Sequence, residues 1–378
     1  MNVKYTGPCK DYSGYGEACR HDVAALLSVG VDVSTQVPRY SLEISDYGKI
    51  GQKVTPCENK VIEYKYKIIH TTPNVYKQFI EPDKYNIGRV FWETDKLPLD
   101  FAINCQLLDE IWTGSKYNAE AIRNAGVTKP IHIIPEAIDT DIDEYQPYIV
   151  ANQQDFKFYS IFEWTERKNP QALLTAFWQE FKPEEKVSLT VKTYIDNFTP
   201  DKRADIMQLY KMVKKKARLD IYPATYMYRN LMDRHQLYRF HTTFDCFVSA
   251  HRGEGWGIPQ VEAMLTGHAI ISTNCGGVHE YLANKTNSLL IPYSMENVDN
   301  NRNQAWYTRD QKWASIDILE LRNAMRWCYE NQDQCRKIGE LARALVVDKF
   351  SLRAVGQKML DRLKDIDAGK VSTNYENT

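Results

Sequence analysis

The sequence predicts an α/β protein with two doubly wound domains, each built on a parallel β-sheet. At 378 residues the chain exceeds one ordinary core and has the length of two domains. Short β-branched or aromatic runs alternate with segments of helical periodicity, which is typical of repeated βαβ units. A polar stretch over residues 145–155, without apolar periodicity, separates two such series.

The first series contains six expected strands. They cover residues 3–5, 31–33, 67–70, 89–92, 110–113 and 131–134. Between the first two strands, apolar residues at i, i+4, i+7 and i+8 predict a helix that follows Gly16 and ends at Gly30. The chain therefore begins as strand, loop, helix and strand.

The second series contains five expected strands and a helical end. The strands cover residues 156–162, 187–193, 244–249, 269–273 and 288–291. Asn169 and Pro170 are typical of a helix N-cap and first turn, and the apolar stripe that follows predicts a buried helix face. Residues 316–366 are expected to form two or three helices, and residues 367–378 a frayed tail.

Composition indicates an ordinary globular chain. Charged residues make up 26% and hydrophobic residues 43%, and no apolar run approaches the ~18 residues of a spanning helix. The 48 Lys and Arg balance 49 Asp and Glu, so the overall charge does not indicate nucleic acid as a partner. The eight cysteines include no CxxC pair, which argues against a zinc site or a disulfide framework. No secretory signal begins the sequence, and we expect a cytoplasmic location.

The segment from His251 to Gly267 is the part of the sequence richest in chemistry. Its three alternate glycines let the backbone approach a ligand, and the helix expected behind them presents unpaired N–H groups to an anion. Glu254 lies on the glycine-rich loop, and Glu262 lies about one turn into the helix, whose first-turn proline is Pro259. A carboxylate there is suited to accept two hydrogen bonds from a vicinal diol such as ribose. A nucleotide would satisfy both features.

At these residues the sequence resembles the retaining GT-B glycosyltransferases of the family-4 type, also described as EX7E glycosyltransferases or glycosyl transferases group 1. The resemblance extends over nearly the whole chain, and the order and spacing of its parts make it specific. Those parts are Glu254-x7-Glu262 with Ala263, Met264 and Gly267, then Thr273, Gly276-Gly277 and Glu280, and earlier Ser13-Gly14-Tyr15-Gly16, Trp112-Thr113-Gly114-Ser115, Ile134-Pro135 through Asp139, and Arg167-Lys168.

This resemblance implies the GT-B architecture, in which two Rossmann-like domains face each other across a crevice. It implies an N-terminal acceptor-side domain at 1–148 and a C-terminal nucleotide-sugar-binding domain at 149–350. Residues 351–378 are then expected to form a helix that crosses back to the first domain, followed by a tail.

The resemblance also implies roles for individual residues. Glu254 and the backbone at Trp256, Gly257 and Ile258 would hold hydroxyls of the donor sugar, and Glu262 would hold the ribose. Lys168 and Arg167 would neutralise the diphosphate leaving group, which requires fixed cations when no metal is present. The loop containing Gly14 and Gly16 would close over the same diphosphate from the first domain.

The sequence departs from the family pattern at three places. Many members have a histidine near the reacting carbon where this chain has Glu93, so Glu93 is a candidate catalytic residue, and His70 is left open as an alternative. Glu136 replaces the usual Asn, which would alter acceptor or donor contacts. Around Lys168 the usual GRL-x3-KG arrangement is absent, and only the lysine aligns.

We expect a same-face substitution without a divalent metal or other cofactor. A double displacement would need a carboxylate beneath the anomeric carbon, and no residue is identifiable as one. Asp139-Thr140-Asp141 has the letters of a DxD metal triplet, but it lies in a loop that the family uses otherwise.

The expected activity is transfer of a hexose from a UDP- or GDP-sugar to a hydroxyl of a glycan, a lipid-linked glycan or another acceptor, as part of glycan biosynthesis. A GT-B sugar phosphorylase or epimerase, and a non-catalytic nucleotide-sugar-binding module, are the alternatives. A basic cluster on an expected helix is most simply a solvated face, although an acidic acceptor, a peripheral membrane contact or nucleic acid is left open there. The cluster consists of Lys211, Lys214, Lys215, Lys216 and Arg218.

Overall fold

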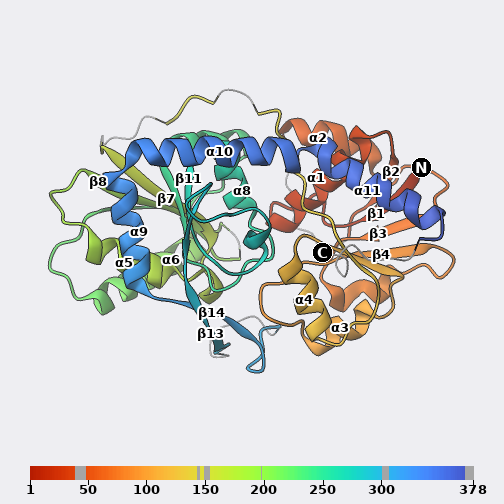
Figure 1. The fold of residues 1–378 in the computed structure, drawn as a ribbon, viewed down its shortest axis with the longest axis horizontal. Helices are drawn as coiled ribbons and strands as arrows, with labels where there is room; N and C mark the ends of the chain where they lie inside the picture. The colour runs from red at the N-terminus through yellow and green to blue at the C-terminus, as the bar shows by residue number, and fades with distance from the viewer. Residues whose placement is uncertain (39–47, 143–144, 149–153, 197, 300–305, 371–378) are drawn as a thin grey trace.

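The computed structural model describes residues 1–38, 48–142, 145–148, 154–196, 198–299 and 306–370. Two parallel sheets with helices packed on them form two lobes that lie side by side (Figure 1). The predicted α/β class with two doubly wound sheets is confirmed.

The first sheet has the strand order β2-β1-β3-β4-β5-β6, and every neighbouring pair is parallel. The expected strand at 89–92 was placed wrongly, because β4 ends at Arg89 and the residues after it form the loop that leads to Glu93. The strands are β1 Asn2–Thr6, β2 Asp32–Gln36, β3 Tyr66–Ile69, β4 Tyr85–Arg89, β5 Glu110–Thr113 and β6 Ile131–Ile133. The helices are α1 Gly14–Ser28, α2 Gly48–Val54, α3 Leu99–Cys105 and α4 Lys116–Asn124.

The second sheet has the strand order β12-β11-β10-β7-β8-β9, also parallel throughout. Its strands are β7 Phe156–Glu163, β8 Val187–Tyr194, β9 Ala224–Tyr228, β10 Cys246–Ser249, β11 Ala269–Thr273 and β12 Leu289–Ile291. Its helices are α5 Pro170–Glu180, α6 Pro200–Ala217, α7 Arg234–Thr242, α8 Ile258–Leu265, α9 Ile318–Glu330 and α10 Gln332–Phe350.

Each strand order contains a point where the chain reverses its direction of travel across the sheet. In the first sheet this point lies between β1 and β3, and in the second between β7 and β10. Loops at the carboxyl ends of the strands on either side of such a point separate and leave a crevice, where doubly wound proteins bind ligands. The topology therefore brings four loops together, namely those after β1, β3, β7 and β10.

Local sequence explains the helices that flank the crevice. The Asn169 side chain accepts a hydrogen bond from the Ala172 N–H, and Pro170 occupies the first turn of α5. Ser13 caps α1 in the same way by accepting from the Gly16 N–H. Pro259 lies in the first turn of α8, as the sequence predicts.

The chain returns to the first lobe at its C-terminal end. The long helix α10 runs along the second lobe, and α11, Leu352–Asp367, packs on the first (Figure 1). Leu352, Val355, Met359 and Leu363 are buried in the same apolar cluster as β1 and α1. Arg362 forms a buried ion pair of 2.6 Å with Glu110 of β5.

A hairpin that the sequence did not indicate joins the two lobes on another side. Its strands are β13 Tyr293–Asn297 and β14 Lys312–Ile316, which pair antiparallel. The Asp95 carboxylate of the first lobe accepts a hydrogen bond of 2.6 Å from the Lys312 N–H, and Asp310 forms an ion pair of 2.7 Å with Lys96. The hairpin thus fastens the second lobe to the loop after β4.

Candidate active site

A cavity of about 360 Å³ lies between the two lobes and is lined by residues of both. The loops after β1, β3, β7 and β10 contribute Gly14, His70, Lys168 and Glu254 to its wall. These are the loops that the two chain reversals bring together. The cavity therefore occupies the place where this topology is expected to bind a ligand.

Glu254, Arg167 and Lys168 meet on the second-lobe wall of this cavity. The Lys168 ammonium donates a hydrogen bond to Glu254 Oε2. Arg167 Nη1 lies 3.6 Å from Glu254 Oε1 and donates a hydrogen bond of 2.9 Å to the carbonyl oxygen of Gly253. The structure thus brings together three predicted catalytic residues from two separate loops.

The charges of these three residues depend on one another. Burial alone would raise the pKa of the Glu254 carboxyl, but Lys168 and Arg167 outweigh burial and lower that pKa to about 2. Burial lowers the pKa of the Lys168 ammonium, and the Glu254 carboxylate opposes that shift. The carboxylate can accept hydrogen bonds from a sugar, and the two cations can stabilise an adjacent anion.

Glu93 contacts Arg167 from the first lobe. Its Oε1 lies 3.4 Å from Arg167 Nη2, and its Oε2 accepts a hydrogen bond of 3.1 Å from the Tyr307 hydroxyl. A Cβ on Gly253 would lie 2.0 Å from the Glu93 carbonyl oxygen, so only glycine allows the two loops to come this close. Glu93 therefore lines the cavity as a carboxylate with two partners, and Tyr307 is a contact that the sequence did not indicate.

His70, the alternative to Glu93, also lines the cavity. Its Nδ1 forms a hydrogen bond of 2.6 Å with the Tyr5 hydroxyl, and its ring contacts those of Tyr15 and Phe91. Burial and the nearby Arg89 charge hold the pKa of His70 well below its usual range. His70 is therefore a neutral imidazole at neutral pH.

Glu262, the expected ribose ligand, belongs to an ionic network that crosses between the lobes. Glu262 Oε1 accepts a hydrogen bond of 2.6 Å from Arg234 Nη2, and Oε2 lies 3.2 Å from His241 Nε2. Arg234 Nε also lies 3.2 Å from Glu17 Oε1 in α1. Burial would raise the pKa of Glu262, but Arg234 and His241 lower it. No local sequence pattern indicated Arg234 or Glu17 as members of the site.

The two glycines of the first-lobe loop have different positions. Gly14 lines the cavity, and a Cβ there would lie 3.8 Å from Ile258 Cδ1 of the opposite lobe. Gly16 is buried behind that wall, where a Cβ would lie 2.1 Å from the carbonyl oxygen of Asp11. Gly14 is therefore placed to face a ligand, whereas Gly16 allows the loop to pack tightly on α1.

The backbone after Glu254 forms part of the same wall. Gly257 has a φ of 97°, a left-handed conformation that favours glycine, and Ile258 begins α8 directly after it. Both residues line the cavity. The Trp256 ring is nearly buried and packs on Tyr281 and Phe350, so its side chain supports the loop that the sequence assigned to the donor.

Comparison with known families finds a match over much of the second lobe. Residues 141–303 match the family described as glycosyl transferases group 1. Over these residues the chain is similar to that family. The match includes Glu254, Glu262, Lys168 and Arg167. A comparison with curated proteins finds no match.

Solved structures extend the likeness to the first lobe. HepE from Anabaena, in complex with UDP and glucose, has a TM-score of 0.66 at 15% identity, covering 97% of this chain and 100% of that one. Sucrose-phosphate synthase from Thermosynechococcus elongatus has a TM-score of 0.68 at 14% identity, with 98% and 100% covered. A glycosyltransferase from Rickettsia africae has a TM-score of 0.63 at 13% identity, with 97% and 98% covered. The chain has the GT-B fold.

Glu136 is a cavity carboxyl group that lies apart from Lys168 and Arg167. It lines the cavity, is 6% exposed, and its Oε2 has no hydrogen-bond partner among the residues that the structure describes. Burial raises the pKa of Glu136 to about 8, with Asp22 and Glu254 adding to the shift and Arg89 opposing it. At neutral pH the Glu136 side chain is therefore mainly a neutral acid that can donate a hydrogen bond.

We expect Glu136→Gln to remove part of the pH dependence of stability. A carboxyl whose pKa rises from 4.5 to about 8 on folding favours the folded state most below pH 4.5 and opposes folding as pH rises to about 8. The difference is on the order of 3 kcal/mol by pH 7, at about 1.4 kcal/mol per pKa unit. Thermal unfolding should show the variant more stable than wild type at pH 8 and equal to it near pH 4. A difference in unfolding midpoint between variant and wild type that is the same at pH 4 and pH 8 would contradict this prediction.

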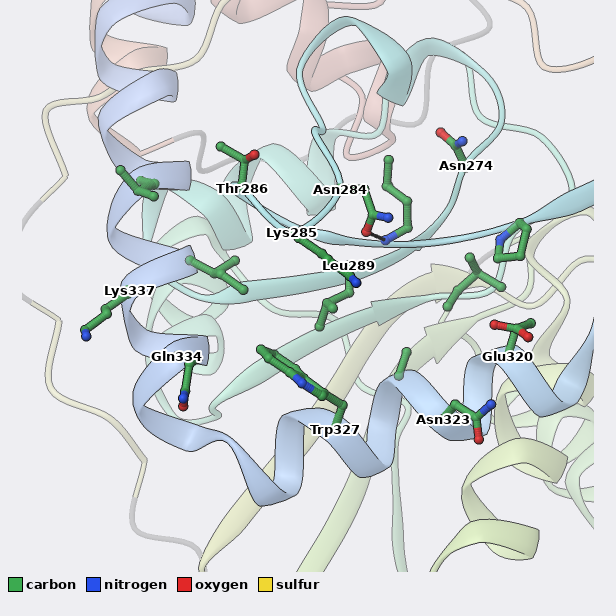
Figure 2. Close-up of a pocket in the computed structure, with 16 residues that line it drawn as sticks. Asn274, Asn284, Lys285, Thr286, Leu289, Glu320, Asn323, Trp327, Gln334 and Lys337 are labelled. Carbon is green, nitrogen blue, oxygen red and sulfur yellow. Dashed lines mark hydrogen bonds between the residues drawn. The ribbon is translucent and has the colours of Figure 1, made fainter.

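A larger cavity of about 870 Å³ lies on the outer side of the second lobe. It is bounded by α9, α10 and the segment around β12, and Figure 2 shows the Trp327 ring of α9 directed into it toward Leu289. Asn323 and Gln334 stand on either side of Trp327. None of the predicted site residues borders this cavity.

Other features bear on the expected partners. In the described part of the chain, no group of three or more His, Cys, Asp or Glu side chains could hold a metal ion. No described helix has both the length and the apolar character needed to cross a bilayer. The basic cluster lies near the end of α6, where Lys211, Lys215 and Lys216 are exposed and the Lys214 ammonium lies 4.3 Å from the centre of the Tyr222 ring.

Proposed function

We propose that the protein is a retaining, metal-independent hexosyltransferase. It would transfer a hexose from a UDP- or GDP-sugar to a hydroxyl of a glycan, a lipid-linked glycan or another acceptor. The observation that carries this proposal is the contact of Glu254 with Lys168 and Arg167 on the wall of the cavity between the lobes. HepE of Anabaena, which shares the fold, was crystallised with UDP-glucose, and this supports a nucleotide-sugar donor.

The donor would lie along the second lobe. Lys168, Arg167 and the first N–H groups of α8 would stabilise the diphosphate, whose negative charge grows as the sugar departs. Glu254 would accept hydrogen bonds from sugar hydroxyls, and Glu262 from the ribose diol. Because these groups are fixed before the donor binds, little reorganisation would accompany the reaction.

In the proposed reaction, the bond from the anomeric carbon to the diphosphate oxygen breaks as the bond to the acceptor oxygen forms on the same face. The acceptor proton passes to the departing phosphate oxygen, so that no protein base is needed. In the apo site Glu93 is paired with Arg167 and Tyr307, and Glu254 is paired with Lys168. Such pairing makes these two carboxylates poor nucleophiles, which favours direct substitution over a covalent glycosyl-enzyme.

The first test is thermal unfolding with UDP, GDP, ADP, CMP and TDP in turn. A ligand at a hundred times its dissociation constant adds ~2.7 kcal/mol of stability. We expect UDP or GDP to raise the unfolding midpoint of the wild type, and we expect Glu262→Ala to abolish that rise by removing the ribose contact. If no nucleotide shifts the wild-type midpoint, the nucleotide site and the proposed function are wrong.

The stereochemistry and the metal requirement need a product assay. With UDP-glucose as donor, ¹H NMR should detect α-glucose as the first product of slow hydrolysis, and excess EDTA should leave the rate unchanged. A β-anomer would contradict retention, and loss of activity in EDTA would contradict metal independence. Release of sugar phosphate that depends on inorganic phosphate would favour the phosphorylase alternative. Tight nucleotide binding without transfer or hydrolysis would favour the binding module.

A further inference from the structure

Lys192 is a buried lysine on the cavity wall that neither the sequence pattern nor the proposed reaction uses. It lies near the carboxyl end of β8, in register with Ile161 of β7 and Tyr228 of β9. Side chains two apart on a strand point to the same face, and both Lys192 and Tyr194 line the cavity. Lys192 is 6% exposed.

The Lys192 ammonium has no hydrogen bond or ion pair with any residue that the structure describes. It lies over the Phe198 ring, whose centre is 5.3 Å from Nζ. Burial lowers the pKa of Lys192 to about 8, and the only charged group that opposes this shift is Glu262. A buried, unpaired ammonium is costly, and a ligand that supplies the missing acceptor would remove that cost.

The surroundings of Lys192 are apolar. Ile161 lies beside Lys192 on β7, the Phe198 ring lies below its ammonium, and Leu231 and Met232 line the same cavity. The Tyr194 ring stacks on the Phe198 ring, with ring centres 4.9 Å apart. Aliphatic and aromatic walls with one hydrogen-bond donor suit a flat heterocycle better than they suit a sugar or a phosphate.

The order of groups along a nucleotide sugar identifies this heterocycle. The chain of groups runs from sugar through diphosphate and ribose to base. Glu254, with Lys168, marks the sugar and diphosphate end, and Glu262 marks the ribose. In the sheet order β10-β7-β8, Lys192 of β8 lies further from Glu254, which follows β10, than Lys168, which follows β7, so it lies on the side of the diphosphate where the ribose and base follow. Glu262 is the charged group that acts on it.

We propose that Lys192 recognises the base of the donor by donating a hydrogen bond to O4 of uracil or O6 of guanine, and so selects these bases over cytosine and adenine. This inference rests on the proposed function. An ammonium has three donors and no acceptor, so it pairs with the carbonyl that uracil and guanine present. Adenine and cytosine present an amino donor at the corresponding position, which leaves the ammonium unpaired.

The test compares UDP, GDP, CDP and ADP by calorimetric titration of the wild type and of Lys192→Met. Wild type should bind UDP or GDP at least tenfold more tightly than CDP and ADP. Lys192→Met should weaken binding of the preferred diphosphate, UDP or GDP, about 10- to 100-fold and leave the affinity for ADP nearly unchanged. The variant would therefore no longer discriminate between the bases. Methionine fits the apolar walls, so the ligand-free variant should unfold at or above the wild-type midpoint. Lys186→Met, an exposed lysine of the same domain, is the matched control and should bind all four as wild type does.

The outcomes separate this inference from the proposed function. If the wild type binds none of the four diphosphates, the proposed function fails. If it binds them and Lys192→Met keeps the wild-type order and affinities, the assignment of Lys192 is overturned while the transferase proposal stands. A wild-type preference for ADP or CDP would likewise overturn the assignment.

Discussion

Replacing Lys168 by methionine is expected to lower kcat by about 10²- to 10³-fold, the usual cost of removing one fixed group that stabilises charge in a transition state. Lys168 is the cation in closest contact with Glu254 on the cavity wall, and Arg167 alone would remain to face the diphosphate. The loss should fall on kcat because the leaving group gains charge only as the bond breaks. The measurement is the rate of nucleoside diphosphate release at saturating donor.

Two comparisons make the Lys168 result specific. Lys168→Met should still show a thermal shift with the preferred diphosphate, because the ribose contact of Glu262 is intact. Lys186→Met, which changes an exposed lysine in the same domain, should retain wild-type kcat. A Lys168→Met rate within twofold of wild type would show that this cation does not assist departure of the leaving group.

Replacing Arg89 by methionine should destabilise the protein by about 3–5 kcal/mol, the cost of breaking a buried ion pair from one side. Arg89 Nε donates a hydrogen bond of 2.8 Å to Asp22 Oδ2, and both residues are fully buried. Arg89 also donates to the carbonyl oxygens of Ile134 and Pro135. Its loss leaves the Asp22 charge unpaired and frees the loop that holds Glu136. Thermal unfolding should show a drop of roughly 10 °C in the midpoint.

A double variant that also changes Asp22, the ion-pair partner of Arg89, tests the cause of the loss in stability. The double variant Asp22→Asn/Arg89→Met should be more stable than Arg89→Met alone, because no buried charge is then left without a partner. Lys60→Met, which breaks an exposed pair of 2.5 Å with Asp32, should cost less than about 1 kcal/mol. An Arg89→Met variant as stable as Lys60→Met would mean that the buried pair contributes little.

Strands buried on both faces could be predicted from the sequence, whereas exposed ones could not. The bounds expected for β5 and β11 agree with the structure, and every residue in those strands is buried. β9 and β13, which were not expected, have only exposed or half-buried side chains. The predicted strand at 89–92 failed because Phe91 and Trp92 are buried in a loop.

The candidate site shows a similar division. Glu254 and Glu262 could be found because one short segment contains both, together with the glycines that give them a ligand-binding context. Arg234, Lys192 and Tyr307 reach the cavity from distant segments, and each is an ordinary residue in its local sequence. Only the sheet topology and the hairpin contact bring them near Glu262 and Glu93.

The return of α11 to the first lobe has a consequence for synthesis of the protein on the ribosome. Gly356 lies so close to α1 that a Cβ there would be 2.1 Å from the Ala25 carbonyl oxygen, and Arg362 neutralises Glu110, which is fully buried in β5. The first lobe therefore lacks a helix and a counter-ion until α11 has left the exit tunnel. Its folding can be completed only after the second lobe, which lies between them in the sequence, has been translated.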